Sequence, residues 1–418
     1  MMFETVAVIG LGYIGLPTAA VLASRKVRVI GVDVNQDTVA TINRGEIHIV
    51  EPDLDMLVHA SVTEGYLHAT TEMQPAKAFL IAVPTPFKDG HKPDLSFIEQ
   101  ACRALAPVLE KGNLVVLEST SPVGTTEKVA QWLAELRSDL SFPQQAGEHS
   151  DIRLAHCPER VLPGRVLHEL VHNDRVIGGM TEKCSKVAAQ LYQLFVQAEC
   201  VLTDVRSAEM CKLAENSFRD INIAFANELA TICEQLSIDP WALIALANRH
   251  PRVNILQPGP GVGGHCIAID PWFIVDAAPE QARLIRQARE INDRRPDQVV
   301  ETIKQIVTQW SVEHSGRPAT VAFLGLSYKA NIDDLRASPA LAIVNRMAAE
   351  SAIRVIAVEP YLDTAPAALS SAVRFSSLGE AVGVADIVVL LVAHDAFKSL
   401  ETLKQERHLV LDICGALK

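Results

Sequence analysis

The sequence predicts an α/β protein in which a doubly wound sheet comes first, a long helical segment follows, and a second α/β unit ends the chain. Its 418 residues exceed what one hydrophobic core usually serves, which favours two or three domains. Hydrophobic residues make up 49% of the chain and aromatic residues only 5%, a balance that suits buried parallel strands alternating with helices. Apolar strand-like runs alternate with helical patterns near both ends.

Composition argues against several classes of function. The net charge is −12 and no cluster of Lys or Arg is dense enough for a phosphate backbone, so no nucleic-acid partner is expected. The longest apolar stretch, residues 387–393, is far shorter than the roughly 20 residues of a membrane-spanning helix. The N-terminus shows no export signal, so a cytoplasmic location and no membrane contact are expected.

The eight cysteines form no CxxC pair, so neither a disulfide framework nor a zinc site is expected. Two pairs, His156-Cys157 and His265-Cys266, place metal-ligand types side by side. Neither pair has the spacing of a metal-binding motif, and we therefore expect no metal.

The first element is a nucleotide-binding signature. A strand over Thr5–Ile9 is followed by the turn GLGYIG (residues 10–15), an alanine-rich helical stretch over residues 14–24, and a strand over residues 27–32 that ends at Asp33. In this context Gly10, Gly12 and Gly15 tighten the turn and let a pyrophosphate approach the helix N-terminus. Asp33 would accept hydrogen bonds from ribose hydroxyls and repel a 2′-phosphate, so NAD is expected rather than NADP. The alternative is a glycine turn without a ligand.

Four more strands are expected in the same sheet, over residues 78–83, 114–118, 152–155 and 175–177, with an irregular surface loop over residues 137–151. Ligands of such sheets lie beyond the carboxyl ends of the strands, where Thr85 and Thr120 follow two of these runs. Both are candidate cofactor contacts, and both could equally serve as local caps.

One long helical pattern covers residues 205–236, and after Asp239-Pro240 another reaches residue 248. Lys212, Asn216 and Arg219 fall on one face of the first helix, at i, i+4 and i+7. Most of the remaining circumference is apolar, so this polar stripe is expected to face a site; the alternative is a solvated surface.

A polar break over residues 309–318 precedes the second α/β unit, with strands expected over residues 319–324, 355–358, 387–392 and 409–411. Its first turn, residues 325–329, lacks the three-glycine fingerprint. A phosphate ligand held by side chains such as Lys329 and Arg336 is therefore expected here, with two exposed surface cations as the alternative.

The segment GPGVGGHCIAID (residues 259–270) places Cys266 behind four glycines and four residues before Asp270. A tight turn needs one or two glycines, so this run suggests a backbone kept bare for a ligand, with a thiol at its edge. A thiolate that adds to an aldehyde gives a thiohemiacetal, which can lose a second hydride to NAD and leave a thioester for water to cleave. Flanking amides and Lys212 could lower the pKa of Cys266 and stabilise an oxyanion, and Asp270 could orient the water. A buried structural cysteine is the alternative.

Seven blocks in order along the whole chain resemble the UDP-glucose/UDP-mannose dehydrogenase family. They are GLGYIGLPTA, Val83-Pro84-Thr85-Pro86, STSPVGTT (119–126), Cys157-Pro158-Glu159-Arg160, EMCKL (209–213) with Asn216, GPGVGGHCIAIDP, and Asp333-Asp334-Leu335-Arg336. Members of this family use NAD to oxidise a sugar C6 alcohol to a carboxylate, a four-electron change. The resemblance implies two Rossmann-like doubly wound domains joined by a long central helix that also forms a homodimer.

The expected domains are an NAD-binding Rossmann-like domain over residues 1–204, a central helical and dimerisation domain with the cysteine loop over 205–310, and a UDP-binding Rossmann-like domain over 311–418. The resemblance implies that Cys266 is the nucleophile and Lys212 the oxyanion stabiliser, that Asn216 and Asp270 assist water and proton transfer, and that Glu159 is a further acid/base candidate. The expected NAD contacts are Gly10, Gly12, Tyr13, Ile14, Gly15, Asp33, Thr85, Thr120 and Thr126. The expected UDP-sugar contacts are Arg160, Val161, Lys212, Asn216, Arg219, His250, Arg252, Gly263, Tyr328, Lys329 and Arg336, with Arg252 reaching the neighbouring subunit's site.

Residues 159–164 and 248–254 resemble the branch of this family that acts on UDP-N-acetyl-D-mannosamine in enterobacterial common antigen synthesis. Relatives that oxidise UDP-glucose usually carry Phe where Arg160 stands, and a guanidinium there could recognise an acetamido carbonyl. UDP-GlcNAc and UDP-glucose are the alternative substrates. The C-terminus departs from the family pattern, because relatives tend to end in an aromatic residue and Arg whereas this chain ends in Leu417-Lys418.

Two functions of other kinds stay open. An ordinary two-electron dehydrogenase of the hydroxyacid type would form one NADH per substrate, whereas the four-electron reaction forms two. A non-catalytic nucleotide-sugar sensor would bind without forming NADH, and the set of Lys212, Cys266 and Asp270 argues against it.

Overall fold

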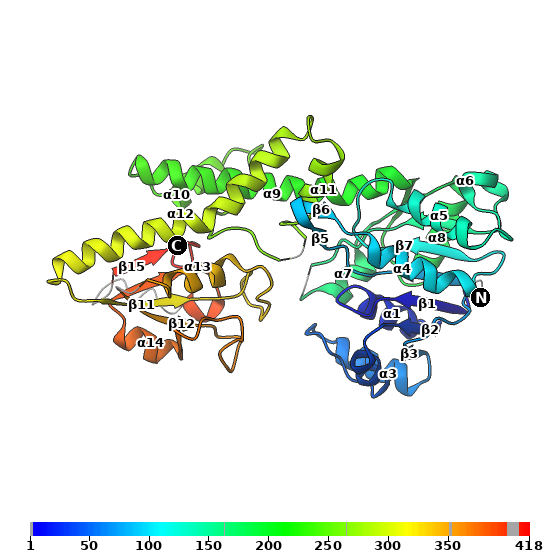
Figure 1. Cartoon of the computed structure of the whole chain (residues 1–418), viewed down its shortest axis with the longest axis horizontal. Coiled ribbons are helices and arrows are strands. Elements are labelled where there is room, and N and C mark those ends of the chain that lie inside the picture. The colour runs from blue at the N-terminus through cyan, green and yellow to red at the C-terminus, as the bar shows by residue number, and fades with distance from the viewer. Residues whose placement is uncertain (1–2, 163, 265, 351–352, 399–408) are drawn as a thin grey trace. The chain divides into compact units, whose positions relative to one another are not determined.

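The structure is a computed structural model that describes residues 3–162, 164–264, 266–350, 353–398 and 409–418 (Figure 1). Pro163 and His265, which belong to two of the sequence motifs, lie outside the described residues. The chain divides into two compact units, Met1–Glu215 and Asn216–Lys418, called unit 1 and unit 2 below. The boundary falls inside α9 (Val205–Gln235), a 31-residue helix that continues from one unit into the next.

Unit 1 is built on an eight-stranded sheet with the order β10-β9-β8-β7-β4-β1-β2-β3. Its strands are β1 (Thr5–Ile9), β2 (Arg28–Val32), β3 (Leu67–Thr70), β4 (Ala78–Ile81), β7 (Leu114–Leu117), β8 (Arg153–His156), β9 (Arg175–Gly179) and β10 (Cys200–Asp204). Within these strands β8 and β9 pair antiparallel and the other neighbours pair parallel. Strand order reverses between β1 and β4, so their adjacent carboxyl ends form the switch point at which ligands of such sheets bind.

Helices cover both faces of this sheet. Along β1, Val6 and Val8 face one apolar layer while Ala7 and Ile9 face the other, because successive strand residues point to opposite sides. The first layer contains α1 (Gly15–Ser24), α2 (Gln36–Asn43), α3 (Leu54–Thr63), α7 (Val166–His172) and α8 (Glu182–Tyr192), and the second contains α4 (Ser96–Leu105) and α5 (Thr125–Leu136). The doubly wound arrangement predicted for this part of the chain is therefore confirmed.

Two smaller features complete unit 1. A two-stranded antiparallel pair, β5 (Phe87–Lys88) and β6 (Lys92–Pro93), flanks a short 3-10 turn. The segment over residues 137–151, expected as an irregular loop, contains the short helix α6 (Pro143–Ala146) and another 3-10 turn. Pro143 starts α6, where its fixed φ and missing N–H are tolerated.

Unit 2 begins with the rest of α9 and continues through α10 (Pro240–Ala247), α11 (Asp270–Ala277) and α12 (Arg283–Glu313). Its parallel sheet has the order β13-β12-β11-β14-β15. The strands are β11 (Ala319–Leu324), β12 (Ile353–Val358), β13 (Arg374–Phe375), β14 (Ile387–Leu390) and β15 (Leu409–Asp412). Helices α12 and α13 (Pro339–Met347) cover one face and α14 (Leu378–Val384) the other, so the second α/β unit is also doubly wound.

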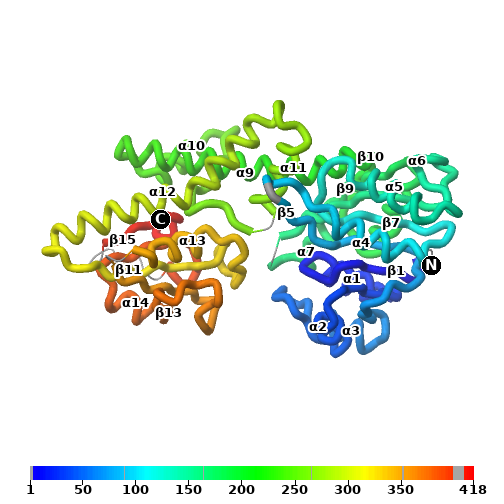
Figure 2. The backbone as a smooth tube through the Cα atoms, viewed as in Figure 1, coloured from blue at the N-terminus to red at the C-terminus, as the bar shows by residue number. Residues whose placement is uncertain are grey.

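Helix α12 is longer than the sequence patterns indicated. The polar break expected from residue 309 starts inside it, and the helix ends only at Glu313 before the chain enters β11 (Figure 2). Trp310 explains the extension, because its side chain is buried against the apolar face of the sheet in unit 2. The fold class as a whole is as predicted: two Rossmann-like units and a long helix that joins them.

Candidate active site

The glycine turn after β1 leaves room for a ligand at one of its three glycines. A Cβ on Gly10 would lie 2.7 Å from the carbonyl oxygen of Ala82, and a Cβ on Gly15 would lie 1.8 Å from the carbonyl oxygen of Gly10. These two positions need glycine because other parts of the chain approach closely. At Gly12 a Cβ would meet no described atom within 4 Å, which leaves this backbone open to a pyrophosphate. Tyr13 and Ile14 continue the open turn into α1.

Asp33, at the end of β2, is held beside this turn. Its carboxylate accepts hydrogen bonds from the Leu11 and Asn35 N–H groups, each at 2.9 Å. A carboxylate oxygen can accept more than one hydrogen bond, so both retain capacity for a ribose hydroxyl. His48 lies close enough to interact with Asp33, and partial burial lowers the pKa of this imidazole although the carboxylate opposes the shift. No sequence pattern had singled out His48.

Two hydroxyls lie at the carboxyl ends of the neighbouring strands β4 and β7. The side-chain oxygens of Thr85 and Ser121 are buried, and neither has a hydrogen-bond partner among the residues that the structure describes. Buried polar atoms are normally satisfied, so these two are suited to a bound group. Thr85 and Thr120 were both predicted as cofactor contacts. Ser121 was missed, although it directly follows Thr120 in the polar segment after β7, and that position was the available signal.

Thr126 is engaged inside the protein. Its N–H and its hydroxyl each donate to Glu209 at 2.7 Å, and the Gly124 N–H donates to the same carboxylate at 2.6 Å. Glu209, from the first part of α9, thereby caps the N-terminus of α5. Burial raises the pKa of Glu209, although these hydrogen bonds favour its ionised form. An NAD contact from Thr126 stays a prediction.

Glu159 follows β8 and is buried. Its carboxylate accepts one hydrogen bond from the Arg175 guanidinium at 2.7 Å and another from the Arg160 N–H at 2.6 Å. The Arg160 guanidinium forms a two-point ion pair with Glu215, with nitrogen to oxygen distances of 3.0 and 2.6 Å, and donates to the Asp174 carbonyl. The guanidinium is therefore held in one orientation with donors to spare, since it has five N–H groups.

A second buried carboxyl lies next to this network. Tyr192 donates to Glu118 at 2.6 Å, and the Arg175 guanidinium lies 5.7 Å from the centre of the Tyr192 ring. Complete burial raises the pKa of Glu118 to about 7, although the Tyr192 hydrogen bond opposes the shift. Sequence reasoning missed Glu118 because it reads as the last residue of a buried strand.

The loop that follows Arg160 is anchored by a residue from a distant part of the sequence. Glu51 is buried and accepts hydrogen bonds from the N–H groups of Gly164 at 2.8 Å and Val166 at 2.7 Å. Val161, a predicted sugar contact, is half-buried against the same apolar layer as α1 and α7. Nothing in the sequence pattern pointed to Glu51, which precedes α3.

Cys266 differs from the other cysteines. Among the eight, all of which the structure describes, it is the one whose side chain is exposed. Burial raises the pKa of Cys102 and of Cys157 to about 12, so these two thiols are poor nucleophiles. The exposure of Cys266 argues against the buried structural role that the sequence had left open.

Cys266 lies one helical turn before α11. Its carbonyl accepts hydrogen bonds from the N–H groups of Ile269 at 3.0 Å and Asp270 at 2.8 Å, so the segment turns as a helix does. The N-terminal end of a helix favours negative charge, which suits a thiolate. The Asp270 side chain is 2% exposed and accepts a hydrogen bond from the Asn216 amide at 2.5 Å. The structure thus brings together two residues that were predicted to act together.

The glycines before Cys266 make close packing possible. A Cβ on Gly263 would lie 2.6 Å from the Ala337 carbonyl oxygen and 2.7 Å from Cβ of Tyr328. Gly264 has φ +79°, and a Cβ there would lie 2.9 Å from the Tyr328 ring. Its N–H donates to the Arg336 carbonyl at 3.2 Å. Gly263 and Gly264 therefore permit close contact with the loop over residues 325–338, which the sequence analysis did not foresee. A backbone kept bare for a ligand stays a prediction.

Replacing Gly263 by Ala is expected to lower the free energy of unfolding by about 1–3 kcal/mol, because the added methyl group meets a backbone carbonyl that cannot rotate away. Gly259→Ala is the matched control, since a Cβ there meets no described atom within 4 Å. Urea unfolding of both variants measures the difference. Equal stability of the two variants would contradict this account of the glycines.

The loop over residues 325–338 carries three predicted UDP contacts. The Tyr328 N–H donates to the Asp334 carbonyl at 3.1 Å, and the Arg336 guanidinium pairs with the Asp334 carboxylate at 2.6 Å. Lys329 is half-buried in the same loop. The structure therefore gathers these three predicted side chains in one short segment that also contacts Gly263 and Gly264.

The remaining predicted contacts lie on or after the long helix. Arg219 is exposed on α9, and His250 and Arg252 lie in an exposed turn after α10, where the Arg252 N–H donates to the His250 ring at 3.3 Å. The C-terminal Lys418 pairs with Asp239 at 2.5 Å, at the start of α10. The altered C-terminal residue thus makes an exposed ion pair within unit 2.

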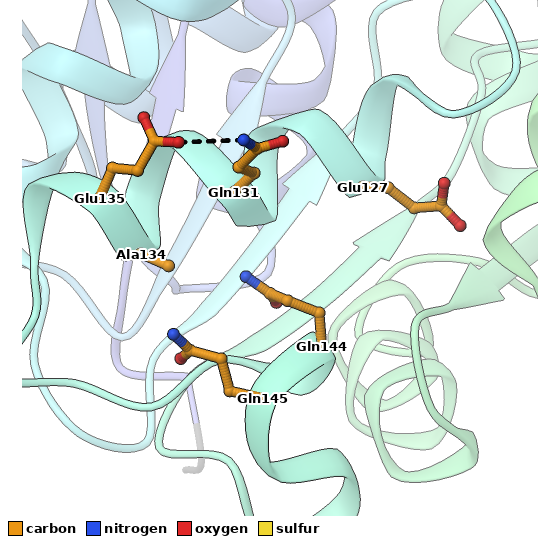
Figure 3. Close-up of a pocket in the computed structure, with 6 residues that line it drawn as sticks. All are labelled: Glu127, Gln131, Ala134, Glu135, Gln144 and Gln145. Carbon is orange, nitrogen blue, oxygen red and sulfur yellow. Dashed lines mark hydrogen bonds between the residues drawn. The ribbon is translucent and has the colours of Figure 1, made fainter.

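A separate cavity of about 480 Å³ lies in unit 1 between α5 and α6 (Figure 3). It is lined by Glu127, Gln131, Ala134, Glu135, Gln144 and Gln145. The Gln131 amide donates to Glu135 at 3.0 Å, and Glu127 pairs with Arg206 at 2.7 Å. None of the predicted site residues lines this cavity, so we do not assign it to the active site.

The predicted catalytic residues are divided between the two units. Lys212 and Glu159, together with the predicted sugar contact Arg160, belong to unit 1, whereas Asn216, Cys266 and Asp270 belong to unit 2.

Among the described residues, no helix combines the length and apolar character that crossing a membrane requires. The same residues contain no cluster of three or more His, Cys, Asp or Glu side chains arranged to hold a metal ion.

Sequence models of three domains match almost the whole chain. The NAD binding domain of the UDP-glucose/GDP-mannose dehydrogenase family matches residues 4–196, its central domain 206–294 and its UDP binding domain 322–418. The chain belongs to the UDP-glucose/GDP-mannose dehydrogenase family. It is an NAD-dependent nucleotide-sugar dehydrogenase. The open Gly12 backbone and the anchored Asp33 fit the NAD-binding part of this activity.

Several proteins of known name are similar to this chain over almost its whole length. An NDP-N-acetyl-D-galactosaminuronic acid dehydrogenase from Ralstonia nicotianae is 62% identical over 99% of this chain and 96% of its own length. UDP-N-acetyl-D-mannosamine dehydrogenases from Campylobacter jejuni and Escherichia coli are 59% and 57% identical, over 96% and 99% of this chain and 98% and 99% of their own lengths. The solved UDP-D-ManNAc dehydrogenase of Pyrococcus horikoshii is 40% identical with a TM-score of 0.86, and covers 99% of this chain and 96% of its own.

Proposed function

We propose that this enzyme oxidises the C6 alcohol of UDP-N-acetyl-D-mannosamine to the carboxylate, in two NAD-dependent steps that remove four electrons. The observation that carries the proposal is an exposed thiol, Cys266, one helical turn before a buried Asp270 held by Asn216. An oxidation that stopped at the aldehyde would have no use for such a nucleophile. The relatives named for UDP-N-acetyl-D-mannosamine support this choice of sugar.

The proposed reaction has two oxidations at C6, with a covalent bond to Cys266 formed between them and hydrolysed at the end. When bound, NAD accepts the hydride that leaves C6 in each oxidation. The first oxidation leaves an aldehyde; the Cys266 sulfur adds to its carbon and the oxygen takes a proton, giving a thiohemiacetal. Oxidation of the thiohemiacetal leaves a thioester on Cys266. Water then cleaves the carbon–sulfur bond, releasing the carboxylate and returning the thiol.

The remaining catalytic residues each have a proposed task. The Lys212 ammonium stabilises negative charge on the C6 oxygen as it develops. Asp270, oriented by the Asn216 amide, positions the water or takes its proton. Glu159, held by Arg175, is a further acid/base candidate. This mechanism requires Lys212 and Cys266 to face the same sugar carbon.

We assign NAD to the turn around Gly12 with Asp33 and the hydroxyls of Thr85 and Ser121, on the strength of their open or unsatisfied groups. The UDP group is assigned to Tyr328, Lys329 and Arg336, with Gly263, Arg219 and His250 as further contacts. The fixed Arg160 guanidinium is assigned to the acetamido carbonyl of the sugar, because it retains donors after pairing with Glu215.

A second candidate substrate is the galacto epimer of the amino sugar, which the 62% identity with the Ralstonia enzyme favours. Offering UDP-ManNAc, UDP-GalNAc, UDP-GlcNAc and UDP-glucose in parallel tests the choice. The proposal predicts the highest kcat/KM for UDP-ManNAc. Preference for UDP-GalNAc would transfer the proposal to that epimer, and preference for UDP-glucose would contradict the role of Arg160.

We further propose that the enzyme is a cytoplasmic homodimer that serves enterobacterial common antigen synthesis, with dimerisation through the central part of the chain and Arg252 reaching the partner's site. The support for the homodimer is an apolar stripe on α9: Phe218, Phe225 and Ile232 recur every seven residues and are 69%, 48% and 45% exposed. Exposed apolar patches of this kind mark protein interfaces, and a second copy offers the same stripe in return.

The double substitution Phe218→Glu with Phe225→Glu is expected to convert the dimer to a monomer, because it places charges in an apolar contact. Sedimentation equilibrium measures the mass. The matched control is Val384→Glu, which adds a charge at an exposed apolar residue of α14. A wild-type chain that sediments as a monomer would overturn the homodimer proposal.

A further inference from the structure

Unit 2 contains a buried polar network that the proposed chemistry does not use. Ser327, Glu359 and His394 have exposed fractions of 0%, 3% and 0%. Ser327 lies in the turn after β11, Glu359 follows β12 directly, and His394 lies shortly after β14. Polar groups at this depth cost free energy unless they are hydrogen-bonded, so the geometry of the network is informative.

The hydrogen bonds of His394 fix which ring nitrogen carries the proton. The Asn331 N–H donates to Nδ1 at 2.9 Å, so Nδ1 is an acceptor and bears no hydrogen. The proton is therefore on Nε2, which lies 3.2 Å from Glu359 Oε2 and 3.2 Å from Ser327 Oγ. The Ser327 hydroxyl donates onward to the Lys329 carbonyl at 2.7 Å. A neutral imidazole thus links the Glu359 carboxylate to the backbone at Lys329 and Asn331.

Glu359 anchors the other side of the network. Its carboxylate accepts hydrogen bonds from the N–H groups of Leu326 at 2.8 Å and Ser327 at 3.0 Å. Burial opposes ionisation of this carboxyl, but the hydrogen bonds from His394 and Leu326 lower its pKa overall. Glu359 therefore acts as an ionised acceptor that holds the turn after β11 through two backbone N–H groups.

The far end of the loop is also tied to the strand end that carries His394. The Asn331 amide donates to the Asp395 carboxylate at 2.9 Å, and the Asp395 N–H donates back to Asn331 at the same distance. Asn331 has φ +62°, a left-handed conformation that Asn tolerates better than most residues. The loop is consequently fixed at Ser327 and at Asn331, on either side of Tyr328 and Lys329.

The corresponding place in unit 1 is arranged differently. Asp33 also follows the second strand of its sheet and also accepts an N–H from the first turn, that of Leu11. There a glycine turn leaves the carboxylate half-buried, whereas Glu359 is covered by His394. In unit 2 a side-chain network thus replaces the glycine fingerprint as the means of shaping the turn.

We propose that His394 is a positioning residue for nucleotide binding: through Asn331, Ser327 and Glu359 it holds the loop over residues 327–336 in the conformation that binds the diphosphate of the substrate. This inference rests on the proposed assignment of Tyr328, Lys329 and Arg336 to the UDP site. The hydrogen bond from Gly264 to the Arg336 carbonyl connects the same loop to the segment before Cys266.

The test measures UDP and NAD affinity of the full chain by titration calorimetry. His394→Leu removes both ring nitrogens at similar volume and is expected to weaken UDP binding by about tenfold or more, with NAD affinity within about twofold of wild type. His394→Asn keeps an acceptor close to the position of Nδ1 and is expected to recover part of the loss. In turnover assays the KM for the UDP-sugar is expected to rise more than kcat falls.

Ser327→Ala removes one hydroxyl and keeps the test decisive if His394→Leu does not fold; a loss of UDP affinity of about threefold is expected. His314→Gln, at the end of α12 in the same unit, is the matched control and is expected to leave UDP affinity unchanged. Unchanged UDP affinity in folded His394→Leu, or an equal loss of NAD affinity, overturns the inference alone. A wild-type chain that binds no UDP overturns the proposed function, and the inference with it.

Discussion

A Cys266→Ala enzyme is expected to lose steady-state NADH formation by at least about 10³-fold, because no other group in the proposed mechanism can hold the aldehyde covalently for the second oxidation. NAD binding is expected to stay close to wild type, since the proposed NAD contacts lie in unit 1 and Cys266 in unit 2. Steady-state absorbance of NADH and a separate NAD titration measure the two effects.

The matched control is Cys200→Ala, which removes a half-buried thiol on β10. This variant is expected to retain wild-type turnover. Continued formation of the carboxylate by Cys266→Ala at a rate near wild type would show that the thiol is not the nucleophile.

Lys212→Met is expected to lower kcat by about 10²–10³-fold, because methionine keeps most of the length of the side chain but removes the charge that we propose stabilises the C6 oxyanion. The KM for the UDP-sugar is expected to change much less than kcat, since the interaction strengthens as the charge develops. Lys212→Arg keeps the charge on a wider group and is expected to recover part of kcat.

A suitable control is Lys186→Met, on the exposed surface of α8, where the lysine pairs only weakly with Glu182 across one helical turn. It is expected to leave kcat unchanged. A Lys212→Met enzyme with normal kcat and a raised KM would assign Lys212 to substrate binding alone.

The first part of the fold was predictable because its signals are local. The strand, glycine turn, helix and acid from Thr5 to Asp33 lie within one short stretch, and each has its own pattern. The edge strands were harder to predict: β3 alternates buried and exposed residues and β10 has no buried residue, so neither shows the continuous apolar run of a central strand. The antiparallel pairing of β8 with β9 involves only two residue pairs, and no sequence pattern predicted it.

For the candidate active site, too, features with local sequence signals were predictable and features that depend on distant segments were not. The exposure of Cys266 fits the glycine-rich run before it. Family resemblance gave Asn216 and Asp270 a shared task, but the hydrogen bond between them was not predicted, since 54 positions separate the two residues. The packing of Gly263 and Gly264 against Tyr328 depends on how distant segments meet, and local patterns carry no such information. Glu51 and His394 were missed for that reason.

Counting the NADH formed for each UDP-sugar consumed tests the central claim most directly. With limiting UDP-N-acetyl-D-mannosamine and excess NAD, two NADH per sugar and a carboxylate product are predicted, because in the proposed mechanism the aldehyde stays bound to Cys266 until it is oxidised again. One NADH per sugar, with the aldehyde released as the final product, would contradict the mechanism.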